Sequence, residues 1–358
     1  MKRLLLSGYY GYGNAGDEAV LSGLITGFRS AAPAGDLELT ALSGSPSETR
    51  TAHGIRAVDR YRPAALLPAI ARCDLFLSGG GSLLQDVSSA HSIFYYLGVV
   101  KMAQMLGKKT MFIAQGIGPL SLPRSRRLVA AVANKLDAIT VRDPDSAQLL
   151  REIGVTRPPM EVTADPALLL SAPGAARNGN SFGVALRSWH GQESLGVQVA
   201  AACAASLGAH KPLLLPMQDV SDRLSAEQFR QTWLGQPTAA TLCSTIDGLG
   251  PLLSIIAGCD MMVGMRLHAL ILAAAAGVPS VALSYDPKVS AFMQASGQGD
   301  AVYDLNAPDL DQLAALLACV WAERNARADA LHAALPGLRA KAMQNVEAAL
   351  SLLKTRHK

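Results

Sequence analysis

The segment that decides the fold runs from Met262 to Val289 and reads M-V-G-M-R-L-H-A-L-I-L-A-A-A-A-G-V-P-S-V-A-L-S-Y-D-P-K-V. Apolar residues 261–263 predict a strand, and a helix is expected to follow until Gly277 and Pro279 end it. Residues 280–283 predict a second apolar strand. Strands that alternate with helices at this spacing favour an α/β fold with a parallel sheet.

Three basic side chains accompany this segment. Arg266 and His268 stand near the start of the predicted helix, and Lys288 lies in the loop that leaves the second strand. A helix N-terminus offers unpaired N–H groups and a partial positive charge, so this end of the sheet is suited to an anion. A lone histidine is more often structural, but clustered cations repel one another unless an anion neutralises them. The segment therefore predicts an anion site.

Length and composition limit the function classes. The 358 residues are enough for two domains, and 50% hydrophobic with 17% charged residues argues against long disorder. The net charge of +4 permits an anionic substrate or contact with an acidic membrane surface. No Lys/Arg cluster is interleaved with aromatic residues, so nucleic acid is not an expected partner.

The cysteines and apolar runs favour a cytoplasmic protein, with peripheral contact at the inner membrane face left open. The five cysteines contain no C-x-x-C pair, which is typical of buried free thiols in a reducing compartment. The apolar run after Met1 is too short for a signal peptide, and Gly277 and Pro279 interrupt the longest run. No metal-ligand motif is present, so no metal is expected.

The alternation of strands and helices divides the chain into two halves. It is broken at residues 173–180, a stretch rich in Gly, Pro and Asn that we interpret as a linker. The predicted domains are residues 1–172 and 181–358, each Rossmann-like. The amphipathic helix expected at 325–354 is a candidate to pack back on the N-terminal domain.

Three glycine-rich segments follow predicted strands of the first half: Gly8 to Asp17, Ser78 to Asp86 and Gln115 to Pro119. All three are expected to open on one edge of the sheet, where ligands bind in open α/β folds. The first is also compatible with a tight turn in which Asp17 is an N-cap or first-turn acid. As a functional residue, Asp17 suits sugar hydroxyls or general-base work. In the second segment, Ser78 to Asp86, the glycines favour close approach of a ligand or of the opposing domain.

Two further arginines leave predicted strands. Arg142 precedes Asp143-Pro144, and pairing with Asp143 or Asp145 is at least as favoured as a functional role. Arg187 follows the first strand of the second half, at the edge where a ligand is expected.

Six motifs in order resemble the polysaccharide pyruvyl transferases, with the CsaB type, which modifies secondary cell wall polymers used in S-layer anchoring, as the nearest branch. From the first to the last they span about four-fifths of the chain: Y-G-Y-G-N-A-G-D-E-A at 10–19, S-G-G-G-S-L-L-Q-D at 78–86, Q-G-I-G-P at 115–119, R-D at 142–143, G-M-R-L-H at 264–268 and Y-D-P-K-V at 285–289.

The resemblance implies a GT-B-like α/β fold of two facing Rossmann-like domains with parallel sheets and a cleft between them. It implies transfer of the pyruvyl group of phosphoenolpyruvate (PEP) onto a sugar as a ketal, with phosphate release and no cofactor. The implied acceptor is N-acetylmannosamine on a lipid-linked cell-wall precursor. His268 is expected to be the catalytic acid and Asp17 the base or a hydroxyl anchor. The expected substrate-binding residues are Arg266, Lys288, Arg187, Arg142, Asn14, Gly80, Gly81 and Gln85.

Two other classes of function stay open, and so does the oligomeric state. A glycosyltransferase that uses a nucleotide sugar would need an acidic ribose clamp near residues 265–290, where the sequence offers Asp286 among cations. A non-catalytic sugar- or anion-binding module would need no proton donor.

Overall fold

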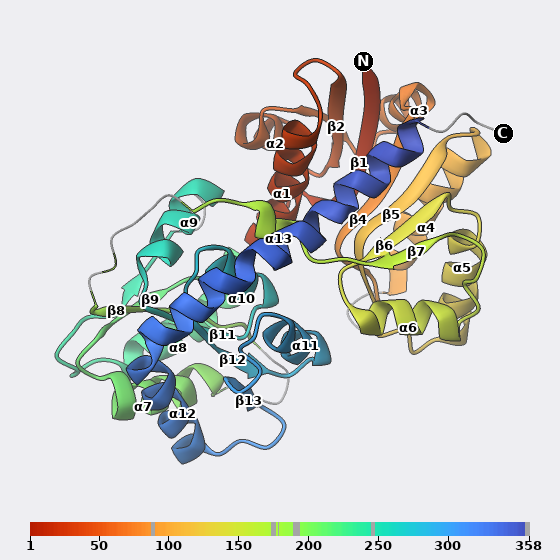
Figure 1. Cartoon of the computed structure of the whole chain (residues 1–358). Coiled ribbons are helices and arrows are strands. Elements are labelled where there is room, and N and C mark those ends of the chain that lie inside the picture. Colours follow the sequence, from red (N-terminus) through yellow and green to blue (C-terminus); the bar gives the residue numbers. More distant parts are fainter. Residues whose placement is uncertain (87–89, 173–176, 178, 189–193, 245–247, 355–358) are drawn as a thin grey trace. The chain divides into compact units, whose positions relative to one another are not determined.

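The computed structural model describes the chain except residues 87–89, 173–176, 178, 189–193, 245–247 and 355–358. The chain forms two compact units (Figure 1). Unit 1 consists of Met1–Tyr12, Asp17–Leu169 and Arg339–Lys358, and unit 2 of Gly13–Gly16 and Leu170–Leu338. The main division thus lies beside the predicted linker, of which residues 173–176 and 178 fall outside the described part. Two shorter segments belong to the unit opposite to the one that their sequence position suggests.

The first half of the chain alternates strictly between strands and helices. Its elements are β1 (Lys2–Tyr10), α1 (Ala15–Ala31), β2 (Leu37–Ser43), α2 (Pro46–His53), β3 (Arg56–Asp59), α3 (Pro63–Arg72), β4 (Leu75–Leu84), α4 (Ala90–Met105), β5 (Lys109–Ile117), α5 (Pro123–Ala133), β6 (Ala138–Val141), α6 (Pro144–Glu152), β7 (Met160–Val162) and the 3₁₀ helix η1 (Pro166–Leu169).

The second half repeats the alternation and ends with two consecutive helices. Its elements are β8 (Ser181–Ala185), α7 (Leu195–Leu207), β9 (Lys211–Leu214), α8 (Asp219–Thr232), β10 (Thr241–Leu242), α9 (Leu249–Gly258), β11 (Met261–Gly264), α10 (Leu267–Ala275), β12 (Ser280–Ser284), α11 (Pro287–Ala295), β13 (Val302–Asp304), α12 (Leu310–Ala322) and α13 (Arg324–Lys354).

Both units contain a parallel sheet with Rossmann-type strand order. Unit 1 has the order β3-β2-β1-β4-β5-β6-β7, and unit 2 has β10-β9-β8-β11-β12-β13. Every pair of neighbouring strands is parallel. The direction of connection reverses between β1 and β4 and between β8 and β11. Ligands bind outside the carboxyl ends of strands at such switch points. The expected α/β fold with two Rossmann-like domains is confirmed.

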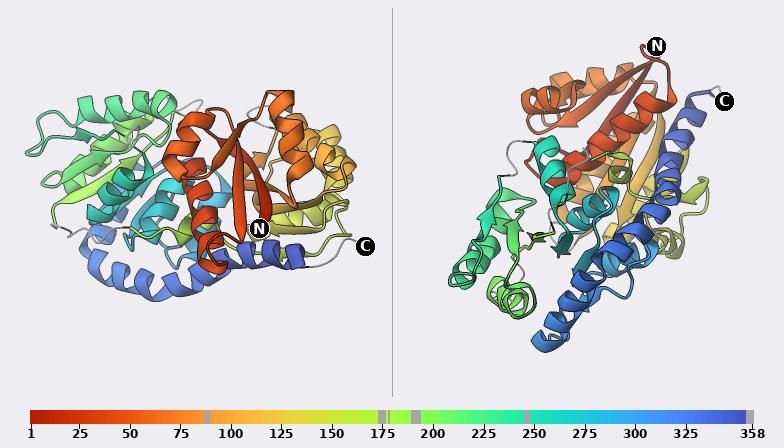
Figure 2. Two further views of the ribbon diagram at one scale, coloured as in Figure 1. Left: turned by 90° about the horizontal axis from the view of Figure 1, so that it is seen from above. Right: turned by 60° about the vertical axis from the view of Figure 1, so that its left-hand side comes forward.

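Alternate strand residues bury the two faces of the unit 1 sheet. Leu5, Phe76 and Phe112 pack in a core with α3, α4, α5 and α6. Leu4 and Ile113 face the other way, into a core with α1 and the C-terminal part of α13. The further views in Figure 2 show that part of α13, in blue, along the sheet of this unit. Burial of each such large side chain contributes about 1.5–3 kcal/mol, so the last helix stabilises unit 1.

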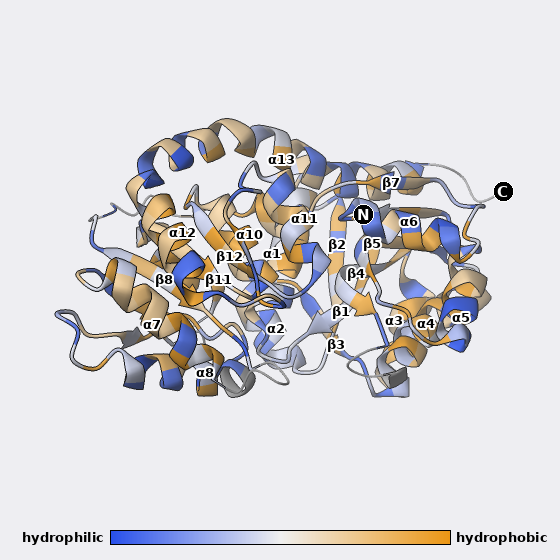
Figure 3. Ribbon diagram, turned by 90° about the horizontal axis from the view of Figure 1, so that it is seen from below, coloured by the Kyte–Doolittle hydropathy of each residue, from blue (hydrophilic) through white to orange (hydrophobic). Residues whose placement is uncertain are grey.

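Unit 2 is covered in the same two-sided manner. Phe182 and Val184 of β8 pack with helices α7, α8 and α12. Helix α10 is apolar all around, and every residue from Ala269 to Ala275 is buried, as expected for a helix inside a core. Figure 3 shows the strands β11 and β12 beside it coloured towards the hydrophobic end of the scale. Near-continuous apolar strands are typical of parallel sheets buried on both faces.

Several predicted elements differ from the structure. The glycine-rich segments expected as loops after strands lie partly inside them, because β4 continues to Leu84 and β5 to Ile117. The expected basic loop after β12 is the start of helix α11, which we did not predict. The helix α2 and the short strands β7 and β13 were also missed.

The cysteines and the helices can be compared with the sequence-based expectations. All five cysteines are free, and Cys73, Cys203 and Cys259 are buried as expected. Cys319 is exposed, which corrects the expectation of buried thiols, because it lies on the outer side of α12. Within the described part of the chain, none of the helices combines the length and the apolar character that crossing a membrane requires.

Candidate functional site

The carboxyl edge of the unit 2 sheet carries four of the predicted site residues. Arg187 follows β8, Arg266 and His268 follow β11, and Lys288 follows β12. These three strands are neighbours in the order β8-β11-β12 and flank the switch point. The structure therefore brings these basic residues to one edge of one sheet, as the sequence predicted.

Arg266 is held by a carboxylate that the sequence analysis did not identify. Its backbone is extended (φ −78°, ψ 118°) just before α10, which lets its side chain leave the helix axis. Its Nε donates to Oδ2 of Asp222 at 3.0 Å, and its Nη2 donates to Oδ1 of the same residue. Asp222 is fully buried on α8 and also accepts from the backbone N–H of Gln218. Asp222 thus neutralises one of the three cations for which the sequence predicted a bound anion.

The other two cations are positioned by the Y-D-P-K motif. Arg187 Nη1 donates to the hydroxyl of Tyr285 at 3.2 Å, and its guanidinium lies 5.6 Å from that ring centroid. The Asp286 side chain accepts from the backbone N–H of Lys288 at 3.0 Å and so caps α11. Lys288 therefore stands in the first turn of α11. The N-terminus of this helix adds positive potential to the carboxyl edge of the unit 2 sheet.

His268 packs against a segment from the beginning of the chain. It is half-buried in the first turn of α10. A Cβ built on Gly16 would lie 2.3 Å from His268 Nδ1, so only glycine leaves room for the imidazole there. The Gly16 segment is tied to unit 2 by a bond from Ala15 N to Met217 O and by an antiparallel bridge between Asn14 and Gln218.

Asn14 has a local role in that segment. Its Oδ1 accepts from the backbone N–H of Gly16 at 3.0 Å, which is the geometry of an N-cap at the start of α1. The predicted substrate-binding role of Asn14 stays a prediction, and the bond explains why the chain turns here.

Asp17 lies in the first turn of α1, where its carboxylate faces the glycine stretch of β4. The residue is buried, at 8% exposure. A Cβ on Gly81 would lie 2.8 Å from Asp17 Oδ1, and one on Gly80 would lie 2.4 Å from Val20. Gly80, at φ 77°, therefore permits close packing of α1 on β4. The glycines thus have a packing reason within unit 1, and their contact with substrate stays a prediction.

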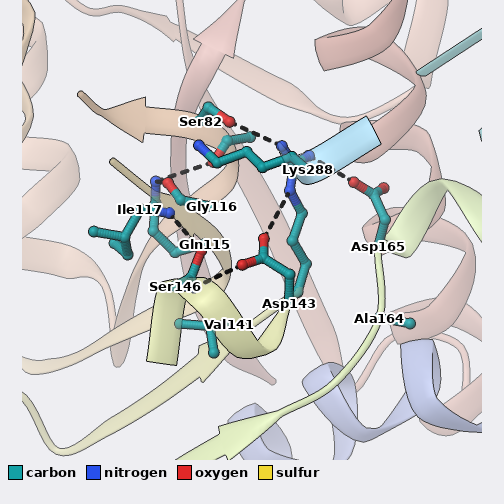
Figure 4. Close-up of polar contacts among 12 residues, drawn as sticks. Ser82, Gln115, Gly116, Ile117, Val141, Asp143, Ser146, Ala164, Asp165 and Lys288 are labelled. Atoms are coloured by element: carbon teal, nitrogen blue, oxygen red, sulfur yellow. Dashed lines mark hydrogen bonds and ion pairs between the residues drawn. The ribbon is translucent and has the colours of Figure 1, made fainter. Parts of the chain in front are cut away.

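Arg142 is anchored inside unit 1 by residues from three elements. Its Nη1 donates to Asp165 Oδ2 at 2.9 Å and its Nη2 to Ser82 Oγ at 2.8 Å. Its Nε is 3.9 Å from Asp143 Oδ2, while Asp143 caps α6 through the N–H of Ser146 (Figure 4). The predicted partner Asp143 is thus secondary, and Asp165, 23 residues along the chain, is the main one.

Gln115 and Gln85 have different surroundings. Gln115 is fully buried in β5 and donates to the carbonyls of Gly81 and Gly116, so it fixes the backbone of the glycine stretch (Figure 4). Gln85 is half-buried directly after β4. Of the two, Gln85 has the accessible position.

A cluster at the carboxyl edge of unit 1 was not predicted. Arg60 is buried directly after β3 and donates through Nη1 to the carbonyl of Gly8 at 2.8 Å. Its guanidinium lies within 5.6 Å of four ring centroids, at the nearest 4.4 Å. The rings belong to Tyr12, Tyr61, Tyr95 and Tyr96. A Tyr-rich first loop was the only sequence signal for this cluster.

A chain of hydrogen bonds supports the segment between β1 and α1. His53 Nε2 is 2.6 Å from Glu18 Oε2, and His53 Nδ1 is 3.0 Å from Ser22 Oγ. The second oxygen of Glu18 accepts from the N–H of Gly11 at 2.7 Å. These bonds therefore hold the loop between β1 and α1 through its backbone.

The described residues contain no group of three or more His, Cys, Asp or Glu side chains with the arrangement of a metal site. At the unit 2 edge, Arg266 pairs with the buried Asp222, Arg187 bonds to Tyr285, and Lys288 stands in the first turn of α11. This arrangement can bind a small dianion and place an imidazole beside it.

The model of the family described as polysaccharide pyruvyl transferase matches residues 14–287, which is more than half of the chain. The chain belongs to this family. The matched region contains His268, Arg266, Arg187 and Arg142 and stops one residue before Lys288. No curated protein matches the sequence.

Solved structures resemble the chain in fold. A putative UDP-N-acetylglucosamine 2-epimerase from Listeria monocytogenes has a TM-score of 0.67 at 12% identity, covering 98% of this chain and 96% of its own. The MnaA–UDP complex from S. aureus has a TM-score of 0.66 at 10% identity, covering 100% and 99%. The spinosyn rhamnosyltransferase SpnG has 0.59 at 14%, covering 98% and 100%. At these identities the similarity shows the GT-B-like fold alone.

Proposed function

We propose that this chain is a ketal-pyruvyltransferase that moves the pyruvyl group of PEP onto two hydroxyls of a sugar and releases phosphate. The observation that carries the proposal is the imidazole of His268, which stands in the first turn of α10 against Gly16, at an edge that also holds Arg187 and Lys288. Membership of the polysaccharide pyruvyl transferase family supports the reaction class.

PEP carries a carboxylate and a phosphate, and the unit 2 edge offers a partner to each. The proposal assigns Arg187, Arg266 and Lys288 to these two groups. Guanidinium groups suit planar carboxylates, and an ammonium acts as a point charge on phosphate. Arg266 acts from a fixed position because both oxygens of Asp222 accept its N–H bonds. Arg142 is proposed as a further contributor, which Asp165 and Ser82 hold in unit 1.

The reaction uses one acid and one base. His268, as imidazolium, gives a proton to the methylene carbon of PEP, which makes C2 electrophilic. One sugar hydroxyl adds to C2 and passes its proton to the carboxylate of Asp17. The bond from C2 to the phosphate oxygen then breaks, phosphate leaves, and the second hydroxyl closes the ketal. The proton of the second hydroxyl leaves with phosphate. Asp17 releases its proton to solvent and His268 takes one up, so the turnover balances without a cofactor.

The proposed acceptor is N-acetylmannosamine on a lipid-linked cell-wall precursor, as in the CsaB type. The proposal places the enzyme in the cytoplasm with peripheral contact at the inner face of the membrane, where such a precursor is available. Asn14, Gly80, Gly81 and Gln85 are proposed to line the acceptor side.

The test is to incubate PEP and a nitrophenyl disaccharide acceptor with wild type, His268→Ala and His210→Ala. We expect His268→Ala to lower phosphate release by about 10²–10⁴-fold while PEP still binds. His210 is the matched control because it precedes β9, at the opposite edge of the same sheet. Near-normal turnover by His268→Ala would refute the role of the acid. Phosphate release without a ketal on the sugar would refute the transfer.

A nucleotide-sugar glycosyltransferase is the second candidate, favoured by the UDP bound in the S. aureus MnaA complex. It would need an acidic ribose clamp near residues 265–290. Asp286 is the acid that the sequence offered, but its carboxylate caps α11 through the N–H of Lys288. Release of UDP from a UDP-sugar, with none of phosphate from PEP, would favour this candidate. PEP affinity that does not vary with pH, without phosphate release, would favour a non-catalytic module.

A further inference from the structure

The carboxyl edge of unit 1 exposes aromatic rings that the proposed reaction does not use. We define the tyrosine cluster as Tyr9, Tyr12, Tyr61 and Tyr95. Tyr9 is the last residue but one of β1, and Tyr61 follows β3. The two strands lie on the same side of the switch point with β2 between them. Tyr61 is 65% exposed. The cluster thus lies at the edge of the sheet where a ligand of an α/β fold is expected.

The rings of the tyrosine cluster are held in fixed positions. Tyr9 and Tyr12 stack with ring centroids 4.4 Å apart, and the Tyr12 hydroxyl donates to the Tyr61 hydroxyl at 2.9 Å. Tyr95 donates to the backbone carbonyl of Arg60 at 3.0 Å. A tyrosine side chain has two χ angles, so rings already fixed in place lose little entropy when they bind a ligand.

Arg60 indicates that this arrangement is built for more than packing. The guanidinium is buried, and its Nε has no hydrogen-bond partner in the structure. Burying a cation is costly unless it is paired, and a methionine would fill the same space without that cost. The guanidinium lies 4.4–5.6 Å from the centroids of the surrounding rings, so its cation–π contacts help to fix where these rings lie.

The carboxylate of Asp17 lies near Tyr9 of the cluster and near the buried Tyr96, whose ring packs against Tyr95. Burial raises the pKa of Tyr9, and the charge of Asp17 raises it further. Burial raises the pKa of Tyr96 to about 12, with a further contribution from Asp17. The phenols therefore stay neutral at physiological pH. Neutral hydroxyls, ring faces and one carboxylate are the groups that recognise the hydroxyls and C–H faces of a pyranose.

We infer that the tyrosine cluster binds the sugar next to the one that receives the pyruvyl group. Asp17 would hold hydroxyls of the reacting sugar, and the exposed face of Tyr61 would stack on its neighbour. The inference rests on the proposed function for the identity of the reacting sugar. A hydrocarbon chain is a poorer occupant, because the cluster carries a hydroxyl-to-hydroxyl bond and Asp17 at its side.

The test compares a nitrophenyl disaccharide with free N-acetylmannosamine on wild type, Tyr61→Ala and Tyr61→Phe. We expect Tyr61→Ala to weaken disaccharide binding about tenfold, which is about 1.4 kcal/mol, without changing monosaccharide binding. Tyr61→Phe keeps the ring and should stay within about twofold of wild type. Met105→Ala, at a residue of α4 that is 78% exposed, is the control for loss of an exposed apolar side chain.

Binding is measured by calorimetry or NMR without PEP, and phosphate release with PEP. Unchanged disaccharide affinity in Tyr61→Ala, or equal losses for both sugars, would overturn the inference. A Tyr61→Phe variant that binds the disaccharide as weakly as Tyr61→Ala would also overturn it. So would a Tyr61→Ala variant that no longer binds vesicles of anionic lipid but still binds the disaccharide, because the cluster would then contact a membrane. If Tyr61→Ala selectively weakens disaccharide binding but wild type releases no phosphate from PEP, the sugar site stands and the proposed function fails.

Discussion

The carboxyl edges of the two sheets hold an arginine in opposite ways. In unit 2, both oxygens of the fully buried Asp222 accept from Arg266. In unit 1, Arg60 donates to a backbone carbonyl and lies among tyrosine rings. The first arrangement fixes a charge that can meet an anion, and the second fixes uncharged surfaces. Sheets with the same strand order thus present edges suited to two chemically different ligands, a dianion and a sugar.

The largest expected effect comes from removing the carboxylate of unit 2. Asp222→Asn leaves Arg266 beside a neutral amide, and breaking a buried ion pair costs about 3–5 kcal/mol of unfolding free energy. We expect the apparent KM for PEP to rise as well, because Arg266 loses its fixed position. Denaturant unfolding and phosphate release measure the two effects.

The control for this prediction is the double variant Asp222→Asn/Arg266→Gln, which removes both charges. We expect it to be more stable than Asp222→Asn alone, since no unpaired cation remains. If the loss of unfolding free energy in the double variant equals the sum of the losses in the two single variants, the carboxylate has a role other than pairing with Arg266.

A smaller effect is expected from the arginine of unit 1. Arg60→Met keeps apolar volume and removes the charge and the bond to Gly8, so we expect a loss of about 1–3 kcal/mol in unfolding free energy. Disaccharide binding should weaken and the KM for PEP should stay unchanged. A change in the KM for PEP as large as that of Asp222→Asn would show that the two edges do not divide the substrates.

The smallest effect concerns pH. Burial holds the pKa of Tyr96 at about 12, above the usual value near 10 for an unfolded tyrosine. Stability from this group is fully present below about pH 10 and is lost as the pH rises towards 12. A phenolate absorbance titration of wild type against Tyr96→Phe should show one late-titrating tyrosine fewer. Equal titration curves up to pH 12 would contradict this assignment.

The sequence predicted the unit 2 edge better than the unit 1 edge. Arg266, His268 and Lys288 follow apolar strands, and parallel order places such residues together. Asp222 gave no signal, because an aspartate 44 residues from its partner looks like part of a solvated helix face. Arg60 likewise resembled an ordinary loop residue, since only the fold brings the tyrosines around it.

The two helices that were missed begin with the same pattern. Asp286 followed by Pro287 is an N-cap followed by proline at the first helical position. Ser45-Pro46 before α2 has the same pattern. The helix expected at residues 325–354 is confirmed as α13, because its amphipathic pattern is long enough to decide. The three-residue strands β7 and β13 are too short to show a period.

The final part of helix α13 belongs to unit 1. Val346 and Ala349 complete the core beside α1, Asn345 bonds Thr163 and the carbonyl of Ala164, and Lys109 Nζ donates to the carbonyl of Leu352. During synthesis, a chain folds from its N-terminus as residues leave the ribosome. Unit 1 must therefore keep one apolar face partly uncovered while residues 170–338 are translated. The unit made first is the one that is finished last.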